Sequence, residues 1–117
     1  MEREYTDAFG AWWNTLNQSA QEDLSAVVAL LEEKGPALPF PFSSSIESSK
    51  YSHMRELRIQ NKANPLRVLY AFDRRRTAIL LIGGNKKGNK RWYTTHVPLA
   101  DRLYAEYLLE REKEDKK

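Results

Sequence analysis

Residues 66–84 read LRVLYAFDRRRTAILLIGG, and this stretch decides the fold. In its first part, from Leu66 to Asp73, apolar residues recur at alternate positions, which is typical of a strand with one buried face. Residues 77–82 then contain a continuous apolar run, 78–82, that suits a central strand buried on both faces. The charged segment 73–76 between them predicts a turn. The stretch therefore predicts two neighbouring antiparallel strands.

Two further strands extend this pair. From Met54 to Gln60, Leu57 and Ile59 alternate with polar residues, and residues 61–65 can form the hairpin loop that leads into the next strand. Residues 91–97 are expected to form a fourth strand. The result is a small twisted antiparallel sheet.

Two amphipathic helices precede the strands. Apolar residues recur at helical spacing in both, namely Phe9, Trp12, Trp13 and Leu16 in the first and Leu24, Val27, Val28 and Leu31 in the second. Thr6 can cap the start of the first helix. Ser19 and Glu22 have the spacing of a capping box for the second, which Gly35-Pro36 is expected to end.

A long connector follows the helical pair. Residues 36–49 contain three prolines and five serines, which predicts a loop without regular structure. Phe40, Phe42 and Ile46 are expected to attach this loop to the body of the protein.

One helix is expected after the sheet. Pro98 suits its first turn, and residues 111–117 form a charged tail that is expected to fray. Residues 1–117 are thus predicted to form a single α+β domain, with a helical hairpin before the antiparallel sheet and a C-terminal helix after it.

Composition narrows the class of protein. The chain has 117 residues, a net charge of +3 and no cysteine, which excludes a disulfide framework and a thiolate metal site. No apolar run approaches the ~20 residues that a membrane span needs. Residues 2–4 include two acids and no secretory signal is visible, so a cytoplasmic protein without a membrane partner is expected.

The charges are unevenly distributed. Residues 51–96 contain eleven lysines and arginines but only two acids, Glu56 and Asp73, whereas the rest of the chain has eight basic and fourteen acidic residues. Such segregation is typical of a face that binds an anionic partner.

The segment 83–93, GGNKKGNKRWY, concentrates this charge. Two glycines are expected to loosen a loop that carries four cations, Lys86, Lys87, Lys90 and Arg91, followed by two aromatic rings, Trp92 and Tyr93. Cations beside aromatic rings suit single-stranded RNA. The alternative is an ordinary solubilising hairpin, since Gly, Asn and Lys are common turn residues.

Arg67 is unusual because it lies in the middle of an apolar strand, where an unpaired charge is costly. Either it pairs with Glu56 across the hairpin, or it lines a sheet face that receives a phosphate. Arg58 lies on the corresponding face of the neighbouring strand, and two guanidinium groups side by side favour an anion between them.

The remaining chemistry is compatible with RNA cleavage without a metal ion. The chain lacks metal-ligand spacing, a serine elbow and a phosphate-loop motif, so no metal and no cofactor are expected. RNA carries its own nucleophile, the 2′-hydroxyl, and cleavage then needs charge neutralisation and proton transfer. Tyr93 can transfer a proton if adjacent cations lower its pKa, and His96 and His53 are further candidates.

Several motifs resemble the RelE/ParE toxin superfamily, and most closely its phage-derived, HigB-like subgroup. They are Phe9-x-x-Trp12-Trp13 and segments 30–35, 54–58, 66–73, 75–84 and 98–104, which together cover roughly residues 5–109. The resemblance implies a twisted sheet with a helical hairpin and a C-terminal helix. It also implies a short first strand, for which only Glu4-Tyr5 is available.

The resemblance further implies the toxin of a type II toxin–antitoxin module, acting as a ribosome-dependent, metal-independent mRNA endoribonuclease. By motif, Arg67, Lys86 and Tyr93 match residues at the cleavage site. Glu56 stands where relatives that cleave RNA have a basic residue, and His96 is the candidate that takes over its role as proton carrier. The expected RNA-binding residues are Arg58, Lys87, Lys90, Arg91 and Trp92.

The expected partners are the ribosome, mRNA and a helix-turn-helix, HigA-like antitoxin, with DNA contacted only through that antitoxin. Arg74 to Arg76 are expected to touch ribosomal RNA. Two alternatives stay open, because fold does not determine function. They are a ParE-like inhibitor of DNA gyrase and a non-enzymatic nucleic-acid-binding or repressor subunit.

Overall fold

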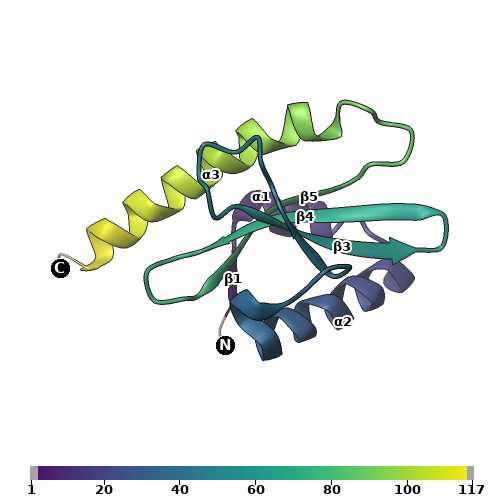
Figure 1. The fold of residues 1–117 in the computed structure, drawn as a ribbon, viewed down its shortest axis with the longest axis horizontal. Helices are drawn as coiled ribbons and strands as arrows, with labels where there is room; N and C mark the ends of the chain where they lie inside the picture. The colour runs from purple at the N-terminus through teal and green to yellow at the C-terminus, as the bar shows by residue number, and fades with distance from the viewer. Residues whose placement is uncertain (1–2, 116–117) are drawn as a thin grey trace.

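The computed structural model describes residues 3–115 and has an α+β architecture (Figure 1). Within these residues a five-stranded sheet has the order β1-β5-β4-β3-β2. Helix α2 lies on one side of the sheet and α3 on the other, so the sheet is the middle layer (Figure 1). The predicted fold class is confirmed. None of the helices in this part of the chain is long and apolar enough to cross a membrane.

The centre of the sheet is the predicted antiparallel meander. Strand β3 (Arg55–Asn61) pairs with β4 (Asn64–Phe72), and β4 pairs with β5 (Ala78–Asn85). Asp73 shapes the β4–β5 turn, since its carboxylate accepts hydrogen bonds from the backbone N–H groups of Arg75 and Thr77. The alternation of residues along β3 and β4 sends alternate side chains to the two helical layers.

Two short strands complete the edges of the sheet. The expected first strand is present as β1 (Arg3–Tyr5), but it pairs parallel to β5, so the sheet is mixed and the expectation of a wholly antiparallel sheet was wrong. The connector was wrongly expected to lack regular structure, because β2 (Ser43–Ser45) pairs with β3. Ser43 is fully buried there and shares a 2.6 Å hydrogen bond with the hydroxyl of Tyr70. The Ser43 hydroxyl is therefore buried with a hydrogen-bond partner, as buried polar groups in folded proteins usually are.

Helix α1 (Asp7–Trp13) begins as predicted, because the Thr6 side chain accepts a hydrogen bond from the backbone N–H of Phe9. Helix α2 (Gln18–Lys34) is capped differently. Asn17, and not the predicted Ser19–Glu22 pair, caps it through a 2.9 Å bond to the N–H of Ala20.

The far end of α2 follows the prediction. Gly35 adopts a φ of 57°, which favours glycine, and a short 3-10 helix, η1 (Gly35–Ala37), follows.

Helix α3 (Trp92–Asp115) corrects three expectations. Residues 92–97 are helical and Arg91 lies in the turn before them, so there is no fourth strand at 91–97; Pro98 lies inside the helix rather than at its start, and residues 111–115 continue it. Residues 116–117 lie outside the described part. The physical reason is the start signal at Asn89, whose side chain accepts a hydrogen bond from the N–H of Arg91 and whose carbonyl accepts one from Trp92. The buried positions Trp92, Val97, Ala100 and Tyr104 then follow a helical spacing.

An apolar layer covers each face of β5. One lies between the sheet and helices α1 and α2, and the other lies between the sheet and α3. At Gly83 an added Cβ would lie 2.2 Å from the Trp12 ring, and at Gly84 it would lie 2.4 Å from Nε1 of Trp92. The two glycines were expected to loosen a loop, but they lie buried in the strand. Their role is to let an indole approach each face of the sheet.

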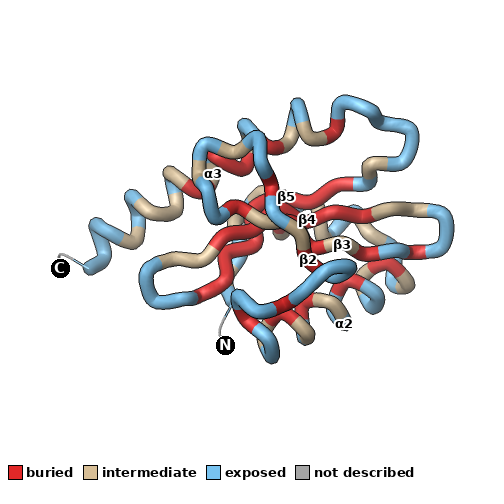
Figure 2. Tube along the Cα trace, viewed as in Figure 1, coloured by how far each residue is buried: buried red, intermediate tan, exposed pale blue. Residues whose placement is uncertain are grey.

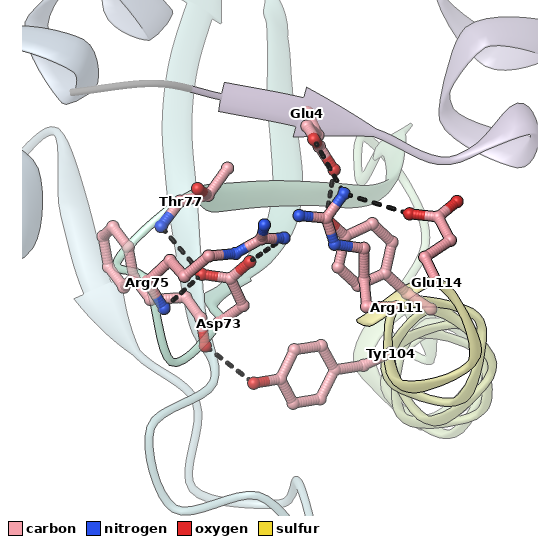
Figure 3. A network of polar contacts seen from close by, with 9 residues as sticks. Glu4, Asp73, Arg75, Thr77, Tyr104, Arg111 and Glu114 are labelled. Atoms are coloured by element: carbon pink, nitrogen blue, oxygen red, sulfur yellow. Dashed lines mark hydrogen bonds and ion pairs between the residues drawn. The ribbon is translucent and has the colours of Figure 1, made fainter. Parts of the chain in front are cut away.

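The beginning and the end of the described chain lie together (Figure 3). The Glu4 carboxylate accepts a hydrogen bond from the Tyr107 hydroxyl and forms an ion pair with Arg111, which also contacts Glu114. Below this cluster, the Tyr104 hydroxyl donates to the carbonyl of Phe72. These bonds tie β1 and the β4–β5 turn to α3.

Candidate functional site

Glu56 lies at the centre of a polar cluster on the α3 side of the sheet. The pleat of β3 turns its side chain toward that face, opposite Leu69 of β4, and leaves the residue only 4% exposed. One carboxylate oxygen accepts a 2.7 Å hydrogen bond from Ser44, and the other accepts a 2.6 Å bond from Tyr93. A buried carboxylate with this many partners satisfies the requirement that buried charge be compensated.

Arg67 and Arg58 are directly paired across β3 and β4. Like charges in this position repel, and Glu56 supplies the anion between them, at 3.6 Å from Nε of Arg67 and 3.5 Å from Nη1 of Arg58. Of the two arrangements that the sequence left open for Arg67, the pairing with Glu56 is therefore present. We call Ser44, Glu56, Arg58, Arg67 and Tyr93 the Glu56 cluster.

Arg67 is only 7% exposed, yet its hydrogen-bonding capacity is not fully used. Nη1 donates a 2.9 Å bond to the carbonyl of Leu66, while Nε is buried without a hydrogen-bond acceptor. The side chain also lines a groove of about 420 Å³ together with Arg58. An anion entering this groove meets two guanidinium groups, which are ion-paired with the Glu56 carboxylate, and the carboxylate of Asp23 at the groove lining.

Tyr93 joins the Glu56 cluster from helix α3, and Lys86 lies beside its ring. Tyr93 lies in the first turn of α3, and the Lys86 Nζ is 4.9 Å from the centre of its ring. Burial raises the pKa of Tyr93 above its ordinary value, and the hydrogen bond and negative charge of Glu56 raise it further, while Arg67 acts in the opposite direction. The condition set for a phenolate at Tyr93, a pKa lowered by adjacent cations, is not met, because the tyrosine hydroxyl faces a carboxylate. The Tyr93 hydroxyl thus stays protonated at neutral pH and donates its hydrogen bond to Glu56.

His96 and Trp92 form a separate pair. Their rings stack with centroids 4.3 Å apart, and Nδ1 of His96 lies 2.9 Å from the carbonyl of Trp92. In the described residues no hydrogen bond or ion pair joins His96 to Glu56 or Arg67. Trp92 is 1% exposed, so in this arrangement its ring packs in the core and has no free face for a base.

The other predicted cations stay at the rim. Lys87, Lys90 and Arg91 are exposed on the segment between β5 and α3. Side chains of Asn85 and Asn89 hold the backbone of this segment by accepting hydrogen bonds from the N–H groups of Lys87 and Arg91. The structure therefore brings Arg58, Arg67, Lys86 and Tyr93 together and leaves these three side chains facing solvent.

Sequence reasoning missed two members of the site. Ser44 lies in a connector that was expected to carry no regular structure. Glu56 was considered as a partner for Arg67 and as the replacement of a basic residue, but not as the centre of the site. A signal was present for Glu56, because it is one of only two acids among residues 51–96. An isolated acid among eleven basic residues is a candidate for pairing with several of them.

Known proteins resemble this chain over most of its length. A family described as phage derived protein Gp49-like matches residues 11–105. The putative toxin HigB3 of Mycobacterium tuberculosis is 40% identical over 98 residues, which cover 83% of this chain and 84% of the relative. The putative toxin HigB2 of the same organism is 38% identical over 104 residues, or 87% of this chain and 52% of that longer protein.

No solved structure gives a significant match. The family match covers well over half of the chain, and HigB3 is matched over most of its own length. The chain therefore belongs to the Gp49-like family of phage-derived proteins and is a HigB-like toxin, in agreement with the motifs read from its sequence.

Proposed function

We propose that this HigB-like toxin is a ribosome-dependent mRNA endoribonuclease that acts by metal-independent attack of the RNA 2′-hydroxyl. As the toxin of a type II toxin–antitoxin module it has a cognate antitoxin as its partner. The observation that carries the proposal is the Glu56 cluster, in which two guanidinium groups and a tyrosine hydroxyl surround one carboxylate, with Lys86 beside the tyrosine ring.

In the proposed reaction the cations stabilise the pentavalent phosphorus. Arg58 and Arg67 bind the non-bridging oxygens of the phosphodiester, and Lys86 adds positive charge on the side of Tyr93. Guanidinium groups suit phosphate because they donate parallel hydrogen bonds. Stabilisation of developing negative charge is commonly the largest single contribution to such catalysis.

The tyrosine–carboxylate pair supplies the proton transfer. The 2′ oxygen attacks phosphorus as Glu56 accepts its proton, the bond from phosphorus to the 5′ oxygen breaks, and Tyr93 protonates that leaving oxygen. The products are a 2′,3′-cyclic phosphate and a 5′-hydroxyl. The 2.6 Å hydrogen bond between the two side chains offers a route for Glu56 to return its proton to Tyr93. The raised pKa of Tyr93 suits a donor, since the hydroxyl stays protonated at neutral pH.

The burial of the cluster supports dependence on the ribosome. Glu56 and Arg67 are 4% and 7% exposed, so an RNA strand that binds the groove in solution does not by itself hold its 2′-hydroxyl and phosphate in line with these groups. A second body that bends the message and holds it in line supplies the orientation that the toxin alone lacks. We also propose that the antitoxin is a helix-turn-helix protein, and that Lys87, Lys90 and Arg91 contact flanking RNA.

Induction of the toxin followed by mapping of transcript 5′ ends tests the proposal. Tyr93→Phe keeps the ring and removes the proton donor, so we expect cleavage to fall by about 10²–10⁴-fold. Tyr51→Phe is the matched control, because its ring also lies on the α3 side and packs edge-on against Tyr104.

Three outcomes contradict the proposal. Unchanged cleavage by Tyr93→Phe removes the assigned proton donor. DNA-damage signalling without transcript cleavage indicates a gyrase inhibitor instead. Absence of growth arrest when the protein is expressed alone indicates a non-enzymatic subunit.

A further inference from the structure

The segment between η1 and β2 exposes two aromatic rings beside the Glu56 cluster. We call residues 39–42, Pro39-Phe40-Pro41-Phe42, the aromatic strap. Phe40 is 68% exposed and Phe42 is 39% exposed, so the expectation that these rings attach the connector to the body was wrong, whereas Ile46 is buried as expected. Figure 2 shows the exposed stretch between α2 and β2.

The strap is held firmly although its rings face solvent. Leu38 before it and Ser43 after it are buried. The backbone N–H of Phe42 donates to the carbonyl of Pro39, and the carbonyl of Phe42 accepts a 2.9 Å hydrogen bond from the N–H of Arg58. The two phenylalanines are therefore presented on a fixed backbone rather than on a loose loop. Large exposed apolar groups on a fixed backbone commonly mark a binding site.

The strap shares a groove with the cations. Pro41 and Phe42 line the same 420 Å³ groove as Arg58 and Arg67. The guanidinium carbon of Arg58 lies 5.3 Å from the centre of the Phe40 ring, so Arg58 contacts both the aromatic strap and Glu56. Phosphate-binding and ring-stacking groups are thus neighbours.

We infer that the aromatic strap is a base-stacking subsite for one unpaired nucleobase of single-stranded RNA, next to the phosphate that Arg58 and Arg67 bind. The inference rests on the proposed function and deepens it. A nucleobase stacks on an aromatic face while the adjoining phosphate binds arginine, which is how proteins bind single strands. The groove has the size of a small-molecule site.

Two polar side chains in the groove suit the edge of a base. Asp23 and Gln60 line the groove together with Phe42. One Asp23 oxygen already accepts a hydrogen bond from Asn61 and the Gln60 amide nitrogen donates to the carbonyl of Lys62, which leaves the second carboxylate oxygen and the amide oxygen as acceptors. A carboxylate in a phosphate groove opposes the phosphate but accepts hydrogen bonds from a base amino group. A purely apolar protein segment would gain nothing from the two guanidinium groups, so the mixed chemistry of the groove favours RNA over a protein partner.

Binding of a short 2′-O-methyl RNA oligonucleotide to the full chain tests the inference without cleavage, because the nucleophile is blocked. Fluorescence anisotropy is measured for the wild type, Phe40→Leu and Phe42→Leu. Each leucine keeps apolar bulk and removes the flat face, and we expect the affinity to fall about fivefold or more. Phe40→Trp restores stacking and is expected to restore binding.

Matched variants separate stacking from other effects. Tyr5→Leu removes another exposed ring, 59% exposed on β1, and is expected to leave RNA affinity unchanged. The Phe40→Leu variant keeps the dependence of log affinity on log salt, whereas Arg58→Met reduces the slope by about 0.7, as expected for one lost phosphate contact to a single strand. Transcript ends are mapped in parallel, and Phe40→Leu is expected to change the base preference beside the cut.

The results distinguish failure of the subsite from failure of the proposed function. If the wild type cleaves transcripts while the leucine variants keep the same RNA affinity and the same cut sites, the subsite is refuted and the endoribonuclease stands. If the leucine variants lose neutralisation by the antitoxin with unchanged RNA affinity and cut sites, the strap is a protein-docking surface and the inference is overturned. If the wild type neither binds the oligonucleotide nor cuts transcripts, both proposals fall.

Discussion

Replacing Glu56 with glutamine tests whether one carboxylate holds the site together. Glutamine keeps the size of the side chain and still accepts a hydrogen bond from Tyr93. It removes the negative charge between two arginines that lie directly opposite each other in the sheet. Arg67, with its side chain 8% exposed, is then left as a buried cation without a counter-ion.

The size of the effect follows from the exposure of the two arginines. A buried charge that loses its partner costs about 3–5 kcal/mol, and Arg67 fits that case. Arg58 has its side chain 30% exposed, so solvent screens it and its contribution is below about 1 kcal/mol. The loss is a large share of the ~5–15 kcal/mol by which domains of this size are stable. We expect the Tm to fall on the order of 10–20 °C.

Unfolding in urea, followed by far-UV circular dichroism at pH 7, measures this loss in a double-mutant cycle. Arg67→Met alone is expected to cost less than Glu56→Gln, because Glu56 retains Ser44, Arg58 and Tyr93 as partners. The double variant has no unpaired buried charge, so it is expected to recover most of the loss. Strictly additive effects in the double variant would refute the assigned coupling.

Three further predictions concern the rest of the fold. Gly84→Ala places a Cβ 2.4 Å from Nε1 of Trp92, so the free energy of unfolding is expected to fall by about 1–3 kcal/mol. Urea unfolding measures this change, and an unchanged midpoint contradicts the close approach. Asn17→Ala removes the cap of α2 and is expected to cost about 1 kcal/mol, whereas Asn17→Ser, measured alongside, keeps most of the stability. Burial raises the pKa of Tyr93, Tyr104 and Tyr107 above the ordinary 10.0, so the stability they contribute is complete below pH 10 and is lost as pH rises through the folded values. Tyrosinate absorbance against pH should therefore show some tyrosines ionising late in the folded protein, and ionisation of all of them near pH 10 contradicts the burial.

Much of the fold was predictable because its signals are local. The alternation in residues 66–72, the helical spacing of Phe9 and Trp12, and the cap at Thr6 all describe contacts that short segments make by themselves. The segment 91–97 was misread because Thr94 and Thr95 favour a strand, while the helix there depends on Asn89 and on burial of Trp92 against Gly84. The contact between Trp92 and Gly84 joins two different elements, so the residue pattern within 91–97 does not reveal it.

The site was predictable in part for the same reason. Arg67 and Tyr93 were identified from residue type and motif, but their common partner Glu56 brings together three separate segments. The sign of the pKa change at Tyr93 depends on which charge its hydroxyl faces, and residue spacing contains no information about that orientation. The exposure of Phe40 likewise depends on how the connector crosses the edge of the sheet.

The contact between Glu4 and Tyr107 spans 103 positions, and β1 has no neighbour in the sheet other than β5. During synthesis, the first strand therefore leaves the ribosome long before its partners are made. A nascent chain of this topology stays incompletely folded until α3 emerges, since non-local contacts form late. Tyr93 belongs to α3, so the topology leaves the Glu56 cluster incomplete until that helix has docked on the sheet.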